Sequence, residues 1–214
     1  MYKVIGFDLD GTILDSLDDL VNAVNKTMDH FNLKRLSKEE VRVFIGAGTF
    51  KLVERAAPKV SKAEVQVMMD YFLTYYSQHA NILSKPFDGM VDELKKLKEK
   101  GYKLAVITNK KHEIGEELVA AHFPGIFDAY IGQKKGIAAK PDYSMFEYIL
   151  EKTKASKEEF FYFGDTDIDA RSLLQNNLQG CLVTWGFRHR DELEIFPVKH
   201  IIDKVSQINE VIDK

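Results

Sequence analysis

The sequence predicts an α/β protein whose core is a doubly wound parallel sheet of the Rossmann-like kind, with an all-helical segment inserted after the first strand. Short apolar runs rich in β-branched and aromatic residues alternate with helical patterns, as expected for parallel strands buried on both faces. Between residues 16 and 85 this alternation stops, and only apolar stripes of helical period remain. With 45% hydrophobic and 29% charged residues in 214, the chain can bury a substantial core.

Six strands and four connecting helices are expected in the α/β part. The strands, in chain order, are expected at Val4–Phe7, Lys103–Thr108, Ala129–Ile131, Phe160–Phe163, Cys181–Thr184 and His200–Ile202. The first helix after the insert has Val91, Leu94 and Leu97 at helical spacing, and Gly101 follows as a stop signal. The other three helices are expected at Ile114–Phe123, Tyr143–Lys152 and Ile168–Asn177.

The inserted segment begins with an apolar stripe along one helix face. That stripe consists of Leu17, Leu20, Val21, Val24, Met28 and Phe31. Ser37–Glu40 and Ser61–Glu64 have the spacing of capping boxes, so each is expected to open another helix. The methionines and aromatic residues of the segment are expected to form its core. We therefore expect two domains, an α/β core at residues 1–15 and 86–214 and a helical insert at 16–85.

The charge balance excludes several classes of function. With 30 basic and 33 acidic side chains the net charge is −3, whereas a dedicated nucleic-acid-binding protein usually has a strong basic excess. No polybasic stretch points to a membrane surface, and no apolar run approaches the ~20 residues of a spanning helix. The single cysteine, Cys181, permits no internal disulfide and is expected to pack in a strand. We therefore expect a soluble cytoplasmic protein without a signal peptide, which binds neither nucleic acid nor membrane.

Acidic residues gather at the predicted ends of two strands. Asp8 and Asp10 follow the first strand, just before Gly11, and Asp165 follows a later strand, with Asp169 four residues on. Because ligands bind beyond the carboxyl ends of strands in open α/β sheets, these carboxylates are expected to converge. At ~4 Å and an effective dielectric near 20, two like charges repel by about 4 kcal/mol unless a cation joins them. Oxygen ligands of this kind favour Mg²⁺, although from these residues alone Asp8 or Asp10 could instead cap a turn.

Three residues near other strand ends are suited to a phosphoryl group. Thr108 offers a hydroxyl, Asn109 an amide, and Lys140, directly before Pro141, a positive charge. The lysine pairs at 110–111 and 134–135 are expected to be solvated surface. The six histidines show no metal-ligand spacing and are expected to be surface or structural residues.

Four segments in this order resemble the motifs of the haloacid dehalogenase-like hydrolases. They are Asp8-Leu9-Asp10-Gly11-Thr12, Thr108-Asn109, Lys140-Pro141 and Gly164-Asp165-Thr166-Asp167-Ile168-Asp169. Each segment alone is a weak to moderate signal, but four in order, each at the end of a predicted strand, make a strong one. The helical insert between the first and second motifs is similar to the family's helical cap. The resemblance therefore covers nearly the whole chain.

The resemblance implies a Mg²⁺-dependent phosphatase that works through an aspartyl-phosphate intermediate. Asp8 would be the nucleophile, and Asp10 would serve as general acid and then as general base. The family's metal ligands correspond to Asp8, the main-chain carbonyl of Asp10, and Asp165. Lys140 would offset the remaining negative charge around the phosphoryl group.

Further residues receive supporting roles from the same resemblance. Thr108 and Asn109 would hold the phosphoryl oxygens, and Asp169 would orient Lys140 or the waters of the metal. A threonine at the place of Thr12 accompanies hydrolysis of phosphate monoesters in the family, whereas sugar phosphomutases more often have another residue there.

Within the family, the sequence is most similar to phosphoglycolate phosphatases. The similarity lies in residues 45–56 of the insert and in residues 183–188 near the C-terminus. The resemblance implies a small phosphorylated metabolite as substrate, phosphoglycolate-like in the first instance. The protein is expected to be a monomer or a homodimer.

The turn that contains Gly46 and Gly48 resembles the substrate-specificity loop of the family. Gly48 and Lys51 are candidate substrate-binding residues, Thr49 is expected to be the N-cap of the next helix, and Arg55 could equally meet a substrate carboxylate. A similarly placed lysine forms the Schiff base in phosphonoacetaldehyde hydrolase, so carbon–phosphorus cleavage through Lys51 is one alternative. Sugar phosphomutase or pyrophosphatase activity is another, and a phosphate-binding module without turnover is a third.

Overall fold

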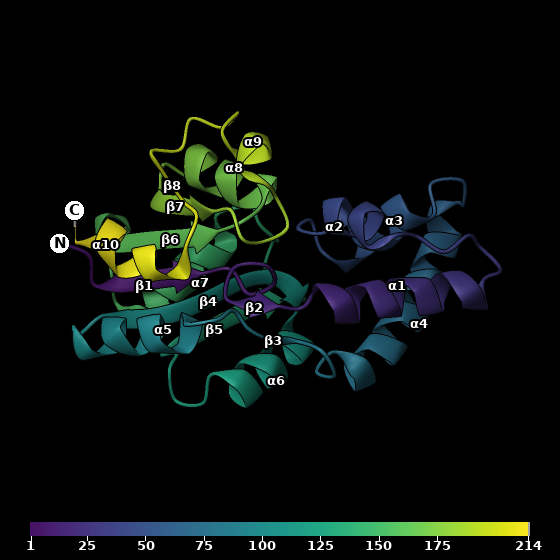
Figure 1. The fold of residues 1–214 in the computed structure, drawn as a ribbon, viewed down its shortest axis with the longest axis horizontal. Coiled ribbons are helices and arrows are strands. Elements are labelled where there is room, and N and C mark those ends of the chain that lie inside the picture. The colour runs from purple at the N-terminus through teal and green to yellow at the C-terminus, as the bar shows by residue number, and fades with distance from the viewer. Residues whose placement is uncertain (214) are drawn as a thin grey trace.

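The computed structural model describes residues 1–213, and its centre is a parallel six-stranded sheet with helices on both faces (Figure 1). The strand order is β5-β4-β1-β6-β7-β8, and all neighbouring strands are parallel. The strands are β1 Val4–Phe7, β4 Lys103–Lys111, β5 Ala129–Gln133, β6 Phe160–Gly164, β7 Gln179–Val183 and β8 His200–Ile202. The predicted doubly wound, Rossmann-like fold class is therefore confirmed. The largest difference in a strand end is in β4, which runs three residues beyond Thr108.

Successive residues of each strand pack into different layers on the two faces of the sheet. The helices of this part are α5 Met90–Glu99, α6 His112–His122, α7 Ser144–Thr153, α8 Asp167–Gln175, α9 Arg190–Leu193 and α10 Ile208–Ile212, with 3-10 turns at Lys157–Glu159 and Val205–Gln207. Ile5 and Phe7 of β1 belong to the same apolar cluster as residues of α5, α6 and α10. Val4 belongs to a second cluster with residues of α7, α8 and α9. Because both faces are covered, the strands are continuously apolar, which is the pattern that predicted them.

The inserted segment forms four helices that lie beyond one end of the sheet, on the right in Figure 1. They are α1 Leu17–His30, α2 Lys38–Phe44, α3 Thr49–Ala56 and α4 Lys62–His79. Helix α1 packs against α2 and α4, and α3 packs against α2 and α4. Met28, Met68, Phe72 and Tyr76 are buried, as expected of core residues. The domain division at residues 15/16 and 85/86 stays a prediction.

Two of the three predicted N-caps in the insert are confirmed. The side chains of Ser37 and Ser61 each accept a hydrogen bond from the main-chain N–H three residues on, and the glutamates at those positions complete the capping boxes. Thr49 is not an N-cap, so that prediction is wrong. Gly48 occupies the cap position with φ 85°, a left-handed conformation that glycine adopts without the steric cost of a Cβ atom.

The two connections to the insert lie side by side, a feature that the sequence did not predict. Leu14–Asp15 (β2) pairs antiparallel with Lys85–Pro86 (β3). The Asp19 carboxylate accepts main-chain hydrogen bonds from residues 82, 83 and 84 at 2.8 to 3.2 Å, which fixes the returning chain against α1. Two-residue strands have no periodic pattern, so nothing in the sequence signals them. Within residues 1–213, no helix has the length and apolar character needed to cross a membrane.

Candidate active site

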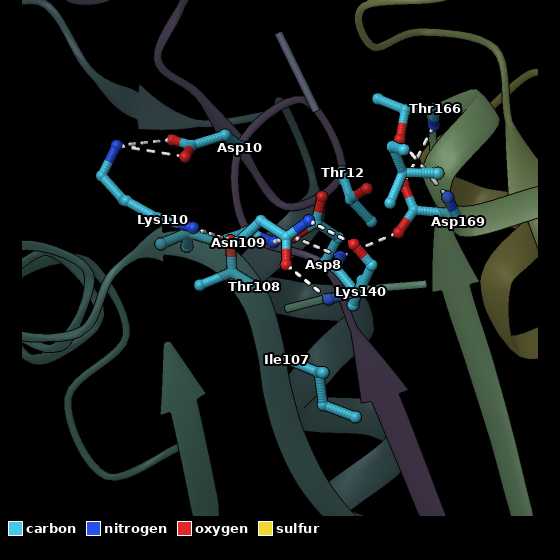
Figure 2. Close-up of polar contacts among 12 residues, drawn as sticks. Asp8, Asp10, Thr12, Ile107, Thr108, Asn109, Lys110, Lys140, Thr166 and Asp169 are labelled. Atoms are coloured by element: carbon cyan, nitrogen blue, oxygen red, sulfur yellow. Dashed lines mark hydrogen bonds and ion pairs between the residues drawn. The ribbon is translucent and has the colours of Figure 1, made fainter. Parts of the chain in front are cut away.

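The carboxyl ends of β1, β4 and β6 bring most of the predicted site residues together (Figure 2). Asp8 directly follows β1, Thr108 and Asn109 lie near the end of β4, and Asp165 directly follows β6. Lys140 reaches the same place from the loop between β5 and α7. Positions more than 130 residues apart in the sequence therefore meet at one edge of the sheet, as the strand-end argument predicted.

Lys140 is the buried cation at the centre of this group. Its Nζ lies 3.0 Å from Oδ1 of Asp8 and 2.8 Å from Oδ1 of Asp169, and it donates a hydrogen bond of 2.7 Å to the Tyr162 hydroxyl. Burial alone would lower the pKa of Lys140, but the attraction of Asp169 and Asp8 outweighs burial and raises it. The side chain therefore stays charged in a region where a lone ammonium would be unfavourable.

Asp8 is a buried carboxylate that is balanced between opposing influences. Its Oδ1 accepts a hydrogen bond of 2.8 Å from the main-chain N–H of Leu9. The pKa of Asp8 is raised to about 6, because burial raises it most and Asp169 and Asp10 also raise it, against the lowering effect of Lys140. In the absence of a further cation, Asp8 is held less strongly in its ionised form than an exposed aspartate.

Asp165 is fully buried and is held by two donors. The Thr12 hydroxyl donates to Oδ1 at 2.7 Å, and the main-chain N–H of Phe187 donates to Oδ2 at 2.7 Å. Burial, together with the negative charges of Asp169 and Asp8, raises the pKa of Asp165 well above its usual range. Gly11 makes this arrangement possible, because a Cβ atom there would collide with the Asp165 carboxylate and its φ of 84° favours glycine.

Asp169 has its hydrogen-bonding capacity taken up by the protein. Oδ1 interacts with Lys140 and with the Tyr162 hydroxyl, and Oδ2 accepts from both the main-chain N–H and the hydroxyl of Thr166. Burial opposes its ionisation, but Lys140 and these hydrogen bonds together lower the pKa of Asp169. Its contact with Lys140 is the geometry expected of a residue that orients that lysine.

The carboxylates fit a divalent cation. One oxygen each from Asp8, Asp165 and Asp169 lie within 4.8 Å of one another, all from buried residues. Burial, and after it the nearby charges of Asp169 and Asp8, raise the pKa of Asp165, and a cation would relieve the repulsion between these like charges. Because Asp169 is already saturated, Asp8 and Asp165 are the better placed pair, and carboxylate oxygens are the ligands that Mg²⁺ prefers.

Asn109 connects the core to the insert. Its amide nitrogen donates to the main-chain carbonyls of Gly46 and Lys140, both at 3.0 Å, and its Oδ1 accepts from the Lys140 main-chain N–H at 2.8 Å. The side-chain amide is thus committed to positioning these segments. Thr108 is 2% exposed, and its side-chain oxygen accepts a hydrogen bond of 3.3 Å from the main-chain N–H of Lys110.

A cavity of about 50 Å³ lies between the sheet edge and the insert. The core residues that line it are Asp8, Asp10, Thr108, Asn109 and Lys110, and the insert residues are Leu20, Ile45, Gly46, Gly48, Thr49, Leu52, Phe72 and Tyr76. Charged and polar groups therefore form one wall, and mainly apolar groups of the insert form the other.

Only some of the candidate specificity residues of the insert reach this cavity. Gly48 lines it, but Lys51 does not. The Lys51 side chain is half exposed, and its Nζ lies 2.5 Å from the carboxylate of Glu54. The Arg55 guanidinium donates to the main-chain carbonyl of Phe44. The structure thus gives neither side chain the placement expected of a substrate ligand.

Lys110 corrects one expectation, because it is not solvated surface. It is 8% exposed, and its Nζ lies 2.9 and 3.1 Å from the two carboxylate oxygens of Asp10 (Figure 2). Lys110 lines the same cavity as Thr108 and Asn109, at a place where the pairing of β4 with β5 is irregular, whereas Lys111 is half exposed and interacts with Glu113. No regular alternation of side chains therefore signals the burial of Lys110, and β4 was expected to end at Thr108.

Two arginines join the insert to the C-terminal part of the core, which the sequence did not predict. Arg188 donates to the main-chain carbonyls of residues 42, 43 and 45 of the insert and interacts with Asp167. Arg42 donates to the carbonyl of Phe187 and forms an ion pair with Glu192 at 3.0 Å. Because the N–H of Phe187 also donates to Asp165, one residue connects the insert to the carboxylate cluster.

Comparison with known proteins agrees with this geometry. The family model for haloacid dehalogenase-like hydrolases matches residues 5–183. A phosphoglycolate phosphatase of Haemophilus influenzae is 30% identical over 97% of this chain and 96% of its own length, and one of Aquifex aeolicus is 30% identical over 86% of each chain.

A solved structure is similar over nearly its whole length. It is a protein from Lactobacillus delbrueckii subsp. bulgaricus to which phosphoglycolate phosphatase activity is provisionally assigned. It is 31% identical and superposes with a TM-score of 0.93 over 99% of this chain and 98% of its own. The sheet order, the convergence of the four motifs and these full-length similarities lead to one conclusion: the chain belongs to the haloacid dehalogenase-like hydrolases.

Proposed function

We propose that this protein is a Mg²⁺-dependent phosphatase that hydrolyses a small, phosphoglycolate-like phosphate monoester through an aspartyl-phosphate intermediate. The family and the phosphoglycolate phosphatase relatives support phosphatase activity at the coarser level. The observation that carries the finer proposal is the placement of Asp8 at the end of the central strand β1. There its carboxylate lies 3.0 Å from the buried ammonium of Lys140 and next to Asp165.

In the first step, an oxygen of Asp8 forms a bond to phosphorus as the bond from phosphorus to the ester oxygen breaks. Asp10 donates its proton to the departing oxygen, which leaves as an alcohol. In the second step, Asp10 takes a proton from water, whose oxygen attacks phosphorus, and phosphate departs with Asp8 regenerated. Each step moves one proton through Asp10, so the residue ends the cycle as it began.

The repulsion between Asp8 and the phosphate dianion is the main obstacle to the first step. The ammonium of Lys140 offsets part of it from a fixed position, since Asp169 and Tyr162 hold its Nζ. Mg²⁺ would be held by Asp8, Asp165 and the main-chain carbonyl of Asp10, and when bound it supplies further positive charge beside the phosphoryl group.

We further propose that the helical insert, residues 16–85, serves as a cap over the site. The insert supplies the apolar wall of the cavity, including Gly48. Excluding water from this space strengthens the electrostatic interactions around the phosphoryl group. Thr108 and main-chain N–H groups near Asn109 are the candidates to hold the phosphoryl oxygens, and the Thr12 hydroxyl holds Asp165 by a hydrogen bond.

The test combines release of phosphate with trapping of the intermediate. Purified protein incubated with a panel of phosphate monoesters should release inorganic phosphate with Mg²⁺ and not with EDTA, and phosphoglycolate should be among the best substrates. Borohydride added during turnover should reduce the acyl phosphate and convert residue 8 to homoserine, which mass spectrometry of the peptide detects. Asp8→Asn should lower turnover by at least about 10⁴-fold.

Asp29→Asn is the matched control, because Asp29 is half exposed and its nearest cation, Arg35, lies 3.7 Å away. It should retain wild-type turnover. Substantial turnover in Asp8→Asn, or trapping of the substrate on Lys51 in place of residue 8, would contradict the aspartyl-phosphate mechanism.

A further inference from the structure

Lys110 is a buried ammonium that faces the cavity, and the mechanism above gives it no part. Its side chain is 4% exposed, and of the lysines among residues 1–213 only Lys110 and Lys140 are buried. Besides its two contacts with Asp10, its Nζ donates a hydrogen bond of 2.6 Å to the hydroxyl of Tyr76 and lies 4.5 Å from the centre of that ring. Tyr76 belongs to α4, so Lys110 bridges the core and the insert directly over the cavity.

The ion pair between Asp10 and Lys110 conflicts with the proton transfer expected of Asp10. Oδ1 of Asp10 accepts a hydrogen bond of 2.6 Å from the Ser16 hydroxyl and also interacts with Lys110, and Oδ2 interacts with Lys110 at 3.1 Å. A carboxyl that gives its proton to a leaving oxygen must turn one oxygen toward that atom, free of these donors. In this arrangement neither oxygen is free.

Releasing Asp10 by itself would be unfavourable. Lys110 would keep only the neutral Tyr76 hydroxyl as a partner, and an ammonium that loses its buried counter-ion is strongly destabilised. A second anion at this position would remove that obstacle. It would take the place of Asp10 on Lys110, and Asp10, having lost that counter-ion and taken a proton from solvent, would be free to face the ester oxygen.

The cavity limits what that anion can be. Its volume is about 50 Å³, and Leu20 and Phe72 give its far wall an apolar character. A group on the leaving side must therefore be short and carry its charge close to the ester oxygen. One ammonium and one phenolic hydroxyl match a carboxylate, which offers two acceptor oxygens to these two donors.

We propose that Lys110, assisted by Tyr76, binds the carboxylate of a phosphorylated short hydroxy acid, and that this carboxylate releases Asp10 for proton transfer. This inference rests on the proposed function and deepens it. Lys110 becomes the residue that restricts the enzyme to esters whose leaving group is itself an anion. Discrimination then arises because a neutral leaving group cannot separate Lys110 from Asp10.

The test compares two substrates of nearly equal size, phosphoglycolate and 2-hydroxyethyl phosphate, in which a hydroxyl replaces the carboxylate. The quantity measured is the ratio of kcat/KM for the first to kcat/KM for the second. Lys110→Met, which keeps the length of the side chain and removes its charge, should lower this ratio by about a hundredfold, the size expected for a buried charged hydrogen bond. Lys110→Arg should keep most of the ratio.

Lys111→Met is the matched control, because Lys111 is the next residue along β4 and is half exposed. It should leave the ratio at the wild-type value. A ratio that stays within about threefold of wild type in Lys110→Met, with both substrates hydrolysed, would overturn the inference while leaving the proposed function intact. Failure of the wild type to hydrolyse any ester would instead count against the proposed function.

A second measurement needs no variant and so does not depend on folding of Lys110→Met. Glycolate should inhibit the wild-type enzyme competitively, whereas ethylene glycol, its neutral counterpart, should not. A substrate with a second phosphate in place of the carboxylate tests the nature of the anion, and it should be hydrolysed more slowly than phosphoglycolate. Equal inhibition by glycolate and ethylene glycol, or a preference for the second phosphate, would overturn the assignment of a carboxylate.

Discussion

Two buried lysines flank the candidate nucleophile, and they are held in different ways. Lys140 contacts Asp8, Asp169 and Tyr162, all of which belong to the core. Lys110 contacts one carboxylate, Asp10, and a tyrosine of the insert. Each lysine thus has a phenolic hydroxyl at 2.6 to 2.7 Å, but the phenol comes from β6 in one case and from α4 in the other.

This difference makes Lys140 a fixed element of the site and Lys110 an element whose partner can be exchanged. Lys140 has two carboxylates that restrain it, so substrate can bind without changing its surroundings. Lys110 has a single counter-ion, Asp10, which is the residue proposed for proton transfer, and its second partner is placed by the insert. We infer that the core side of the site supplies chemistry common to all substrates, whereas the insert side supplies selectivity. The predictions that follow test this distinction.

Of the substitutions at the two lysines, Lys140→Met should have the larger effect, and the effect should not depend on the leaving group. Removing the ammonium leaves a repulsion of about 4 kcal/mol uncompensated, which corresponds to about a thousandfold in kcat. We expect this loss for phosphoglycolate and for 2-hydroxyethyl phosphate alike, measured by release of phosphate at saturating Mg²⁺. If the loss fell on phosphoglycolate alone, Lys140 would be a selectivity residue and the distinction between the two lysines would fail.

Asp8→Asn should abolish turnover and yet stabilise the protein when no divalent cation is present. Burial raises the pKa of Asp8 from 3.8 to about 6, so between these pH values the folded protein binds more protons than the unfolded chain. The free energy of unfolding due to this group therefore falls as the pH rises from about 4 to 6, and it stays lower above that range. The total amounts to about 3 kcal/mol, at about 1.36 kcal/mol for each pKa unit.

Urea unfolding in EDTA measures this effect. The variant should exceed wild type in the free energy of unfolding by about 3 kcal/mol at pH 7.5 and by about half as much at pH 5. Mg²⁺ should narrow the difference, because it stabilises the ionised carboxylates of the wild type. Asp29→Asn should match wild type at both pH values. A variant less stable than wild type at pH 7.5 would show that Asp8 contributes more through Lys140 than burial takes away.

The core side of the site was far more predictable from sequence than the insert side. Asp8 and Asp165 directly follow strands, and a parallel sheet brings such strand ends to one edge, whereas Lys140, marked in the sequence by Pro141, reaches that edge from the loop after β5. The meeting of Asp8 and Asp165 therefore needs only the strand order. The fold class and all six strands were predictable for the same reason, since burial on both faces leaves continuous apolar runs.

The insert side depends on contacts that no local pattern encodes. Tyr76 was expected to be an ordinary core residue of a helical stripe, and it is buried, but its hydroxyl meets Lys110, 34 positions away. Arg188 and the main-chain carbonyls that it binds are about 145 positions apart. Such contacts depend on how the insert is oriented on the core, which the helical period of the insert does not specify. Lys51, the candidate for the alternative of carbon–phosphorus cleavage, has its charge satisfied within α3 by Glu54.

The smallest expected effects come from removing the hydroxyl group of each of the two tyrosines. They compare the core side and the insert side of the site most directly. Tyr76→Phe removes one hydrogen bond from Lys110, which should lower the free energy of unfolding by about 1 kcal/mol and kcat/KM for phosphoglycolate by about fivefold. The rate with 2-hydroxyethyl phosphate should change less, so the ratio between the substrates falls.

Tyr162→Phe removes contacts with Lys140 and Asp169 and should lower both rates together, leaving the ratio unchanged. Steady-state kinetics with both esters, beside urea unfolding of each variant, measures the comparison. If Tyr76→Phe and Tyr162→Phe altered the ratio between the substrates equally, the insert would not be the source of selectivity. A tyrosine of the core would then discriminate between leaving groups as well as a tyrosine of the insert does.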